Sequence, residues 1–321
     1  MANAIAILEP GYADYSTEES ILSGHGLKVV PVGPHEDAAS ALQVINPLGV
    51  MVRERAMTSD LMDICPRLKI IVRYGVGVDN IDIEAARSRG IYVANVPDYG
   101  AENEVSDHAL ALYLAIQRRI PARDQEVRSG RWGVGQAAKI PSRENAMLGL
   151  IGCGRIGLAT ARKFRAFGFE RIVVFDPFLD PGKAAAAGLE LTDLDALCRD
   201  ADVISVHAPL TAETRGILGA DLFATMKPTT IVINVARGGL VDETALADAL
   251  NAGRIFGAGI DVFEQEPVRA DHPLLFTPNT VLSDHTAWYS ERSVGVLQRN
   301  AATEICRVLS GEPPQNWVNR W

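Results

Sequence analysis

Several features are scarce in this sequence of 321 residues, and each scarcity excludes a class of protein. Cysteine occurs four times, at Cys65, Cys153, Cys198 and Cys306, without the C-x-x-C spacing of a metal or redox site. This is too sparse for the disulfide framework of a small secreted domain, so we interpret all four as reduced, mostly buried thiols. The N-terminal region has neither a basic leader segment nor an apolar run of the roughly 20 residues that a membrane span needs. We therefore expect a cytoplasmic protein and no membrane partner.

Positive charge is also in deficit. The sequence has 31 lysines and arginines against 40 aspartates and glutamates, which gives a formal net charge of −9. This balance provides no electrostatic attraction to nucleic acid or to an anionic membrane, so we expect no direct nucleic-acid binding. No internal repeat or low-complexity tract is present. The length is too great for one ordinary core and suits two domains of roughly 150 residues each.

What the sequence does contain is a regular alternation of short β-branched runs with helical patterns. Such alternation is typical of a parallel α/β sheet. A first series of runs ends near Pro97, and a second begins at about residue 146 with a strand that leads into a glycine-rich turn. We predict strands within 4–8, 27–32, 49–52, 68–72 and 91–96, and again within 171–176, 203–208, 229–236, 256–263 and 280–285. The fold class is thus α/β, with two doubly wound parallel-sheet domains.

Helical patterns mark the domain limits. An apolar period over 102–120, carried by Val105, Ala109, Leu112 and Ala115, predicts one helix of about five turns at the domain change, followed by a polar connector over 123–145. A shorter helix near residues 18–26 has Ser16 three residues before Glu19, the spacing of a capping box. The amphipathic segment 291–310 and the tail after it should return to the first domain. We place the boundaries so that residues 1–98 plus 287–321 form one domain and residues 99–286 the other.

A glycine-rich turn is the first motif that carries chemistry. Gly152, Gly154 and Gly157 have G-x-G-x-x-G spacing between a predicted strand and a predicted helix. One glycine allows the tight turn, one the approach of a pyrophosphate, and one the packing of the helix on the strand. Glycine turns of this kind also occur without a ligand. Here Asp176 closes the next strand, at the distance expected for an acid that binds ribose hydroxyls and repels a 2′-phosphate. We expect NAD as the cofactor.

Three later segments place polar side chains at strand ends, where open α/β sheets bind ligands. These side chains are Arg237, Asp261, Glu266 and His285. Singly, the arginine reads as a surface cation, the glutamate as a loop acid and the histidine as a packed ring. Together they suit hydride transfer to a 2-keto acid. His285 would donate the proton, Arg237 would bind the polarised oxygen and carboxylate, and Glu266 would hold the imidazole and stabilise its protonated form.

Several segments resemble, in order, those of the D-isomer-specific 2-hydroxyacid dehydrogenases. They are VRYGVGVDNIDI, NVPDYGAENEVSDHALAL, LGLIGCGRIG, INVARGGLVDE and GAGIDVFEQEP, and the resemblance spans about residues 68–285. It implies a split flavodoxin-like substrate-binding domain and a Rossmann NAD-binding domain, corresponding to the two domains above. It also implies a homodimer, usually formed through the Rossmann domain. HTAWYS, in place of the commoner histidine-x-glycine-glycine, is similar to the branch that contains the C-terminal binding proteins.

The same resemblance implies further site residues. The cofactor would contact the glycine turn and residues at later strand ends, namely Gly152, Gly154, Arg155, Ile156, Gly157, Asp176, His207, Pro209, Ala236 and Asp261. Substrate would meet backbone N–H groups of the YGVG turn, with a cation beside them: Arg73, Tyr74, Gly75, Val76 and Gly77. Trp288 would wall the pocket and favour an apolar side chain on the keto acid, or else fill the core beneath the last helix. His108 is interpreted as structural, and we expect no metal site.

Two other functions remain open on the sequence. Phosphoglycerate dehydrogenase is one, although Trp288 is a poor lining for a phosphate, which favours two or more arginines or lysines. The chain also leaves little room after its last helix for a regulatory domain. The other is a non-catalytic, NAD(H)-sensing scaffold that binds peptides, as C-terminal binding proteins do, against which an extended disordered tail is lacking. The physiological 2-hydroxy acid and the direction of flux are not specified by the sequence.

Overall fold

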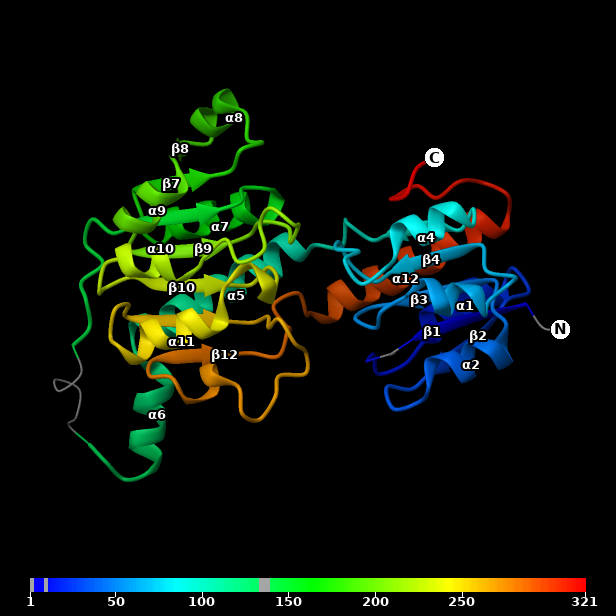
Figure 1. Ribbon diagram of the computed structural model, residues 1–321, viewed down its shortest axis with the longest axis horizontal. Helices are drawn as coiled ribbons and strands as arrows, with labels where there is room; N and C mark the ends of the chain where they lie inside the picture. Colours follow the sequence, from blue (N-terminus) through cyan, green and yellow to red (C-terminus); the bar gives the residue numbers. More distant parts are fainter. Residues whose placement is uncertain (1–2, 9–10, 133–138) are drawn as a thin grey trace. The chain divides into compact units, whose positions relative to one another are not determined.

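The computed structural model describes residues 3–8, 11–132 and 139–321 (Figure 1). The chain divides into a first unit, which runs to Gly100 and includes Ser290–Trp321, and a second unit, Ala101–Tyr289. The boundaries expected from the sequence, 98/99 and 286/287, fall up to three residues earlier.

The first unit is built on a five-stranded parallel sheet of order β2-β1-β3-β4-β5. This is the flavodoxin-like order, in which the chain starts near the middle and moves outward in both directions. The strands are β1 (Ala4–Leu8), β2 (Lys28–Val32), β3 (Gly49–Val52), β4 (Ile70–Arg73) and β5 (Tyr92–Asn95). Three of them, β1, β3 and β4, are buried along their whole length, as expected of parallel strands covered on both faces.

Helices cover both faces of this sheet. One face carries α1 (Ser16–Ser23) and α12 (Glu291–Leu309), and the other carries α2 (Ala38–Ile45), α3 (Ser59–Asp63) and α4 (Ile83–Ser88). The apolar residues of the latter three helices pack with the strands into one core. After α12 the chain pairs with the edge strand β5, where the N–H of Val318 donates to the carbonyl of Val93 at 2.8 Å.

The predicted capping box at Ser16 is wrong. Helix α1 begins at Ser16 itself, with Tyr15 as the N-cap and no side-chain capping bond. The N-cap thus lies one residue earlier than the spacing suggests, and the Ser16 hydroxyl donates to Asp14. A capping box does form at α12, where Ser290 and Ser293 exchange hydrogen bonds.

The second unit has a seven-stranded parallel sheet of order β12-β11-β10-β9-β6-β7-β8. The chain moves outward from β6 in one direction and from β9 in the other, so the switch point lies between these two strands. The strands are β6 (Met147–Ile151), β7 (Arg171–Phe175), β8 (Glu190–Leu191), β9 (Val203–Val206), β10 (Ile231–Asn234), β11 (Gly257–Ile260) and β12 (Thr280–Leu282). Strand β8 was not predicted, because two exposed residues carry no readable pattern.

The helices of the second unit form two layers. Helices α5 (Ala101–Gln117) and α7 (Arg155–Ala166) cover one face, and α9 (Leu194–Asp200), α10 (Ala220–Thr225) and α11 (Glu243–Asn251) cover the other. The predicted long helix is α5. Of the four residues that carried its apolar period, Val105, Ala109 and Leu112 are buried and Ala115 is half-buried, whereas the adjacent Ile116 is buried. A short helix, α8 (Pro181–Ala186), and two 3-10 turns, η2 (Gly238–Leu240) and η3 (Pro273–Phe276), complete the unit.

Part of the predicted polar connector is helical. Helix α6 (Ile120–Arg128) follows a left-handed residue, Arg119 (φ 53°), and includes no buried residue. Its sequence is rich in good helix formers but has no apolar period, so a search based on periodicity misses it. Residues 133–138 of the predicted connector lie outside the described residues.

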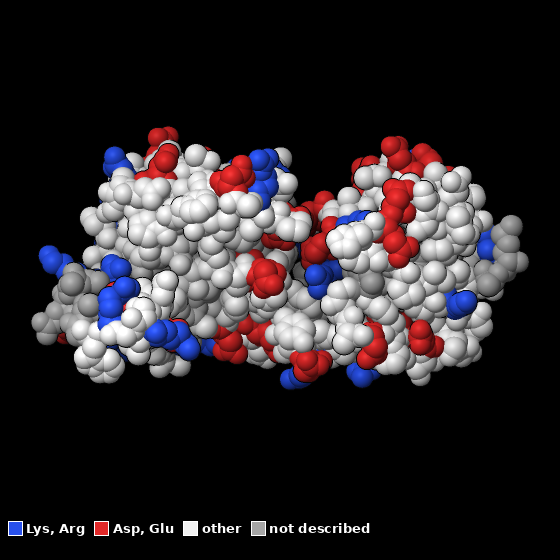
Figure 2. All heavy atoms as spheres, turned by 90° about the horizontal axis from the view of Figure 1, so that it is seen from below, with Lys and Arg blue, Asp and Glu red and all other residues white. Residues whose placement is uncertain are grey.

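Surface charge follows the composition. On the face shown in Figure 2, acidic and basic side chains are scattered, and no continuous basic surface is visible. In the part of the chain that the structure describes, no helix combines the length and apolar character needed to cross a membrane.

Candidate active site

The glycine turn lies between β6 and α7, at the switch point of the second sheet. Gly152 has a φ of +86°, and a Cβ placed on it would lie 2.6 Å from the backbone nitrogen of Ala208. A Cβ on Gly157 would lie 2.6 Å from the Gly152 carbonyl oxygen. Both positions therefore require glycine for the protein's own packing, one at the turn and one where the helix meets it.

Gly154 differs from its neighbours in the motif. It is the N-cap of α7, and a Cβ on it would meet nothing within 4 Å. Packing within the protein does not explain a glycine here, whereas a ligand approaching the backbone would. The open space faces the N-terminus of a 12-residue helix, where first-turn N–H groups and the positive end of the helix dipole attract an anion. This arrangement fits the pyrophosphate of a dinucleotide.

Asp176 lies directly after β7 and beside the glycine turn. Its carboxylate accepts hydrogen bonds from the N–H groups of Cys153, at 2.8 Å, and Phe178, at 2.9 Å. These bonds fix the carboxylate next to the turn and leave it half-buried. The acid predicted from sequence spacing is therefore brought to the glycine turn by the fold.

The remaining predicted cofactor residues lie after β9 and β10. His207 Nε2 lies 2.9 Å from the hydroxyl of buried Ser205, and burial lowers the pKa of His207 to about 4, so its ring is neutral at pH 7. Pro209 is exposed, and its carbonyl accepts from the Thr214 hydroxyl. The Ala236 carbonyl accepts from Arg237 Nη1 at 2.8 Å. All of these groups stand at the carboxyl edge of the sheet, where ligands of such folds bind.

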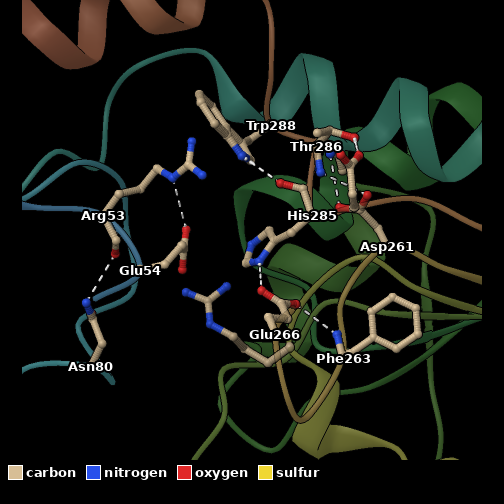
Figure 3. Close-up of polar contacts among 12 residues, drawn as sticks. Arg53, Glu54, Asn80, Asp261, Phe263, Glu266, His285, Thr286 and Trp288 are labelled. Atoms are coloured by element: carbon tan, nitrogen blue, oxygen red, sulfur yellow. Dashed lines mark hydrogen bonds and ion pairs between the residues drawn. The ribbon is translucent and has the colours of Figure 1, made fainter. Parts of the chain in front are cut away.

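His285 is held in an uncommon backbone conformation (Figure 3). Its φ of +57° is in the left-handed region, which costs free energy for a residue other than glycine. Buried Asp261 compensates: its carbonyl accepts the His285 N–H at 2.7 Å, and its carboxylate accepts the N–H groups of Thr286 and Ala287 at 3.0 Å. Trp288 Nε1 donates to the His285 carbonyl at 2.8 Å. The His285 loop is thus held by hydrogen bonds to Asp261 and from Trp288.

Glu266 is the partner of the His285 ring. Its Oε2 lies 2.7 Å from His285 Nδ1, and its Oε1 accepts the Phe263 N–H at 2.9 Å. The side chains of Glu266 and His285 are 29% and 19% exposed, and the contact with Glu266 uses Nδ1 of the imidazole. Burial raises the pKa of Glu266. The hydrogen bond and charge of His285, the Phe263 N–H and the charge of Arg237 lower it by more, so this pKa lies below its ordinary value. The ionised form of Glu266 is therefore favoured beside the His285 ring.

Arg237 follows β10 and precedes η2. It is half-buried, and its charge acts on Glu266 as stated above. The next residue, Gly238, packs on the Glu266 segment so closely that a Cβ there would overlap the backbone of Phe263 and Glu264. The three residues proposed from the sequence for catalysis, Arg237, Glu266 and His285, are therefore neighbours in the second unit.

The first unit carries the predicted substrate-binding turn, residues 74–77. The Arg73 side chain is 9% exposed, with Nε bonded to the Arg53 carbonyl and Nη2 3.4 Å from the Glu54 carboxylate. The N–H groups of Tyr74 and Gly75 already donate to the carbonyls of Val52 and Arg73. The expectation that the whole turn offers N–H groups is thus too broad. Among the described residues, only Val76 and Gly77 of this turn have N–H groups without a hydrogen bond.

The sequence did not predict one buried contact, that of Glu18 with Tyr74, and it did not identify the partner of His108. Glu18 is completely buried and accepts a 2.8 Å bond from the Tyr74 hydroxyl, and burial raises the pKa of Glu18. Its position in the first turn of α1 reads as an ordinary helix-start acid, so no sequence signal separates it. His108, predicted as structural, lies 2.8 Å from the Ser283 hydroxyl and so links α5 to the segment after β12.

The sheet order and the glycine turn place the protein among the dinucleotide-binding α/β proteins. A profile for the NAD-binding domain of the D-isomer specific 2-hydroxyacid dehydrogenases matches residues 110–287. The chain belongs to this family, and it carries the family's NAD-binding domain.

Relatives and solved structures agree with this membership. The chain is 40% identical over 271 residues to D-3-phosphoglycerate dehydrogenase of Archaeoglobus fulgidus, covering 84% of this chain and 51% of that protein. It is 38% identical over 265 residues to glyoxylate reductase of Korarchaeum cryptofilum, covering 82% and 79%. D-lactate dehydrogenase of Aquifex aeolicus, solved with NAD and lactic acid, superposes with a TM-score of 0.88 at 26% identity, covering 99% of each chain. The chain spans about half the length of the phosphoglycerate dehydrogenases it matches.

Proposed function

We propose that the protein is an NAD-dependent D-2-hydroxyacid dehydrogenase that interconverts a small 2-keto acid and its 2-hydroxy acid. The observation that carries this proposal is the 2.7 Å contact of His285 with Glu266 in the unit that holds the glycine turn. Nicotinamide, when bound, supplies or accepts the hydride. In reduction, the Nε2–H of protonated His285 donates a proton to the carbonyl oxygen, and Glu266 stabilises the imidazolium before that transfer. Arg237 attracts the oxygen and the substrate carboxylate.

NAD, rather than NADP, is the proposed cofactor. Asp176 is fixed at the glycine turn by two backbone N–H groups, and its charge would repel a 2′-phosphate. The proposed contacts for the dinucleotide are the ten residues named from the sequence, from Gly152 to Asp261. Asp261 enters this set mainly through its hold on the His285 loop, since its side chain is 1% exposed. Equal kcat/KM with NADH and NADPH would contradict the preference.

The substrate is proposed to have an apolar side chain. Trp288 is fixed three residues after His285 by its bond to the His285 carbonyl, and this segment is the one that is similar to the C-terminal binding protein branch. The first unit is proposed as the substrate-binding domain, with Arg73, Val76 and Gly77 addressing the substrate carboxylate. Tyr74 and Gly75 would shape that turn, since their N–H groups are already bonded.

A homodimer is proposed as well. Helix α6 has no buried residue, and near it Ile120, Val127 and Trp132 are 54%, 54% and 86% exposed. Apolar side chains of this size usually need a covering surface, and a second copy of the chain would supply one. Sedimentation equilibrium of the protein and of Val127→Asp tests this, with weaker association expected of the variant.

Phosphoglycerate dehydrogenase activity is a second candidate, because the relatives at 38–40% identity include proteins with that name. One panel separates the candidates: NADH oxidation with pyruvate, hydroxypyruvate, glyoxylate, phenylpyruvate, 4-methylthio-2-oxobutyrate and 3-phosphohydroxypyruvate. Highest kcat/KM with an apolar keto acid supports the proposal, and highest kcat/KM with the phosphorylated acid overturns its substrate class. NADH binding without turnover of any of them would favour the scaffold interpretation instead.

A further inference from the structure

A second imidazole–carboxylate pair lies in the second unit, outside the residues discussed so far. His272 Nε2 is 2.8 Å from Glu243 Oε2, and the two side chains are only 15% and 12% exposed. Glu243 is the first residue of α11, and His272 directly precedes η3. A carboxylate this buried is costly unless each oxygen has a donor, so the partner of its second oxygen is informative.

That partner is the backbone beside Glu266. Glu243 Oε1 accepts the N–H of Glu264 at 2.7 Å. The neighbouring N–H, that of Phe263, is the one that orients Glu266 Oε1. Two consecutive peptide groups therefore donate to two different glutamates, one at the proposed active site and one at the start of α11. Gly238 abuts the same two residues through its backbone.

The hydrogen bonds also define the tautomer of His272. Its Nδ1 accepts the N–H of Leu274 at 3.4 Å, so in the neutral ring the proton is on Nε2 and is donated to Glu243. The His272 ring packs edge-on against Phe263, with 5.6 Å between ring centroids. Both members of the pair thus contact the segment 263–264, Glu243 through a charge-assisted hydrogen bond and His272 through its ring.

We propose that Glu243 and His272 are positioning residues for the Glu266–His285 pair. Glu243 accepts the Glu264 N–H and so fixes that peptide group. The fixed peptide holds the adjoining Phe263 N–H in place. The Phe263 N–H in turn orients Glu266 toward His285 Nδ1. His272 holds Glu243 in place for this bond. The inference rests on the proposed function, because it assigns these residues to the same proton-donating pair.

The experiment compares Glu243→Ala with Asp242→Ala. Asp242 is the N-cap of the same helix, accepts the Ala245 N–H at 3.0 Å and is exposed, so its loss weakens α11 at the same end without removing the bond to Glu264. A misplacement of about 1 Å in a catalytic group can cost on the order of 100-fold. We expect Glu243→Ala to lower kcat by about 10- to 100-fold with unchanged NADH affinity, and Asp242→Ala to stay within about threefold. Glu243→Gln, which keeps an acceptor for the Glu264 N–H, should recover most of the rate.

A double-mutant cycle with Glu266→Gln identifies the route of the effect. If Glu243 acts through Glu266, Glu243→Ala should cost little once Glu266 is already Gln. Three outcomes would each overturn the inference. The first is that the losses of kcat in Glu243→Ala and Glu266→Gln multiply in the double mutant. The others are an equal loss in Asp242→Ala and a kcat of Glu243→Ala within threefold of the parent protein. If Glu243→Ala does not fold, His272→Gln takes its place in the same cycle.

A readout without turnover keeps this inference separate from the proposed function. The proton in the His285–Glu266 hydrogen bond should give a downfield NMR resonance, assigned by its loss in Glu266→Ala. We expect the resonance in the parent protein and in Asp242→Ala, and its loss or strong broadening in Glu243→Ala. Absence of keto-acid turnover in the parent protein would refute the proposed function alone, whereas an unchanged resonance in Glu243→Ala would refute the positioning role alone.

Discussion

At the residue scale, the site depends on a histidine in a left-handed backbone conformation. His285 can remain there because Asp261 binds three consecutive N–H groups, those of His285, Thr286 and Ala287. The side chain proposed to donate a proton is thereby presented with Nδ1 toward Glu266. Strained backbone conformations of this kind are common in functional loops.

Replacement of His285 or Arg237 by alanine should abolish most turnover and spare NADH binding. In the proposed function these side chains act on the carbonyl group, and general acid catalysis is worth roughly 10²- to 10⁴-fold. Steady-state kinetics and fluorescence titration with NADH measure the two properties separately. A His285→Ala protein with kcat within about threefold of the parent would rule out the assigned role, because that is far below this range.

Glu266→Gln should move the pH profile of keto-acid reduction to lower pH. The low pKa of Glu266 arises partly from His285, after burial has acted in the opposite direction, so the ionised carboxylate and the protonated ring stabilise each other. A neutral amide removes that stabilisation, the ring loses its proton at lower pH, and reduction declines earlier as pH rises. The measurement is kcat/KM between pH 5 and 9 in both proteins. An unchanged alkaline limb would show that Glu266 does not stabilise the protonated His285 ring.

Trp288→Ala should reduce the preference for apolar substrates. Burial of apolar area contributes roughly 25 cal/mol per Å², so loss of about 60 Å² of indole contact corresponds to about 1.5 kcal/mol, or tenfold in kcat/KM. Phenylpyruvate or 4-methylthio-2-oxobutyrate should lose about this factor relative to glyoxylate. If all three substrates decline equally, the tryptophan only supports the His285 loop through its bond to the His285 carbonyl.

At the element scale, the turn between β6 and α7 combines two kinds of glycine. Gly152 and Gly157 are required by contacts within the protein, whereas a Cβ on Gly154 meets nothing within 4 Å. The same motif thus contains positions that packing within the protein requires to be glycine and a position that such packing does not explain. Substitution by alanine can separate them.

Gly154→Ala should fold normally and bind NADH more weakly, because the added methyl group occupies the space before the helix. Replacement of glycine by alanine at an N-cap should cost at most about 1 kcal/mol of stability. Gly152→Ala should instead lower the unfolding temperature, since Gly152 has a positive φ and an added Cβ would lie only 2.6 Å from the Ala208 backbone nitrogen. Thermal denaturation without cofactor and NADH titration give the comparison. Equal NADH affinity in Gly154→Ala would remove this turn from the cofactor site.

At the scale of the whole molecule, acid stability should depend on His207. Burial lowers the pKa of His207 from an ordinary value near 6.5 to about 4, so between these pH values the unfolded chain binds a proton that the folded protein excludes. The free energy of unfolding is therefore unaffected by His207 above about pH 6.5 and decreases as the pH falls toward 4. One excluded proton corresponds to a slope of up to about 1.4 kcal/mol per pH unit.

His207→Gln should flatten this acid-side dependence. Urea denaturation of the cofactor-free protein at several pH values between 4 and 7 measures the slope, with His25→Gln, an exposed histidine, as control. The control should keep the slope of the parent protein. Parallel curves for parent and His207→Gln would mean that other groups account for the loss of stability in acid.

The sequence by itself determined the alternation of strands and helices, the glycine turn with Asp176, and the three polar residues at later strand ends. These features follow from local periodicity and from the rule that parallel strands present their carboxyl ends at one edge. Helix α6 and strand β8 escaped because neither carries an apolar period.

Only the tertiary structure decided how each polar group is partnered. The sequence does not distinguish the buried Glu18 under Tyr74 from a surface acid, nor Ser16 within α1 from an N-cap. It likewise does not show that Glu243 and His272 converge on the backbone beside Glu266. Hydrogen bonds such as these join residues about 20 to 60 positions apart, and their partners are set by how helices and loops pack on the sheet rather than by local pattern.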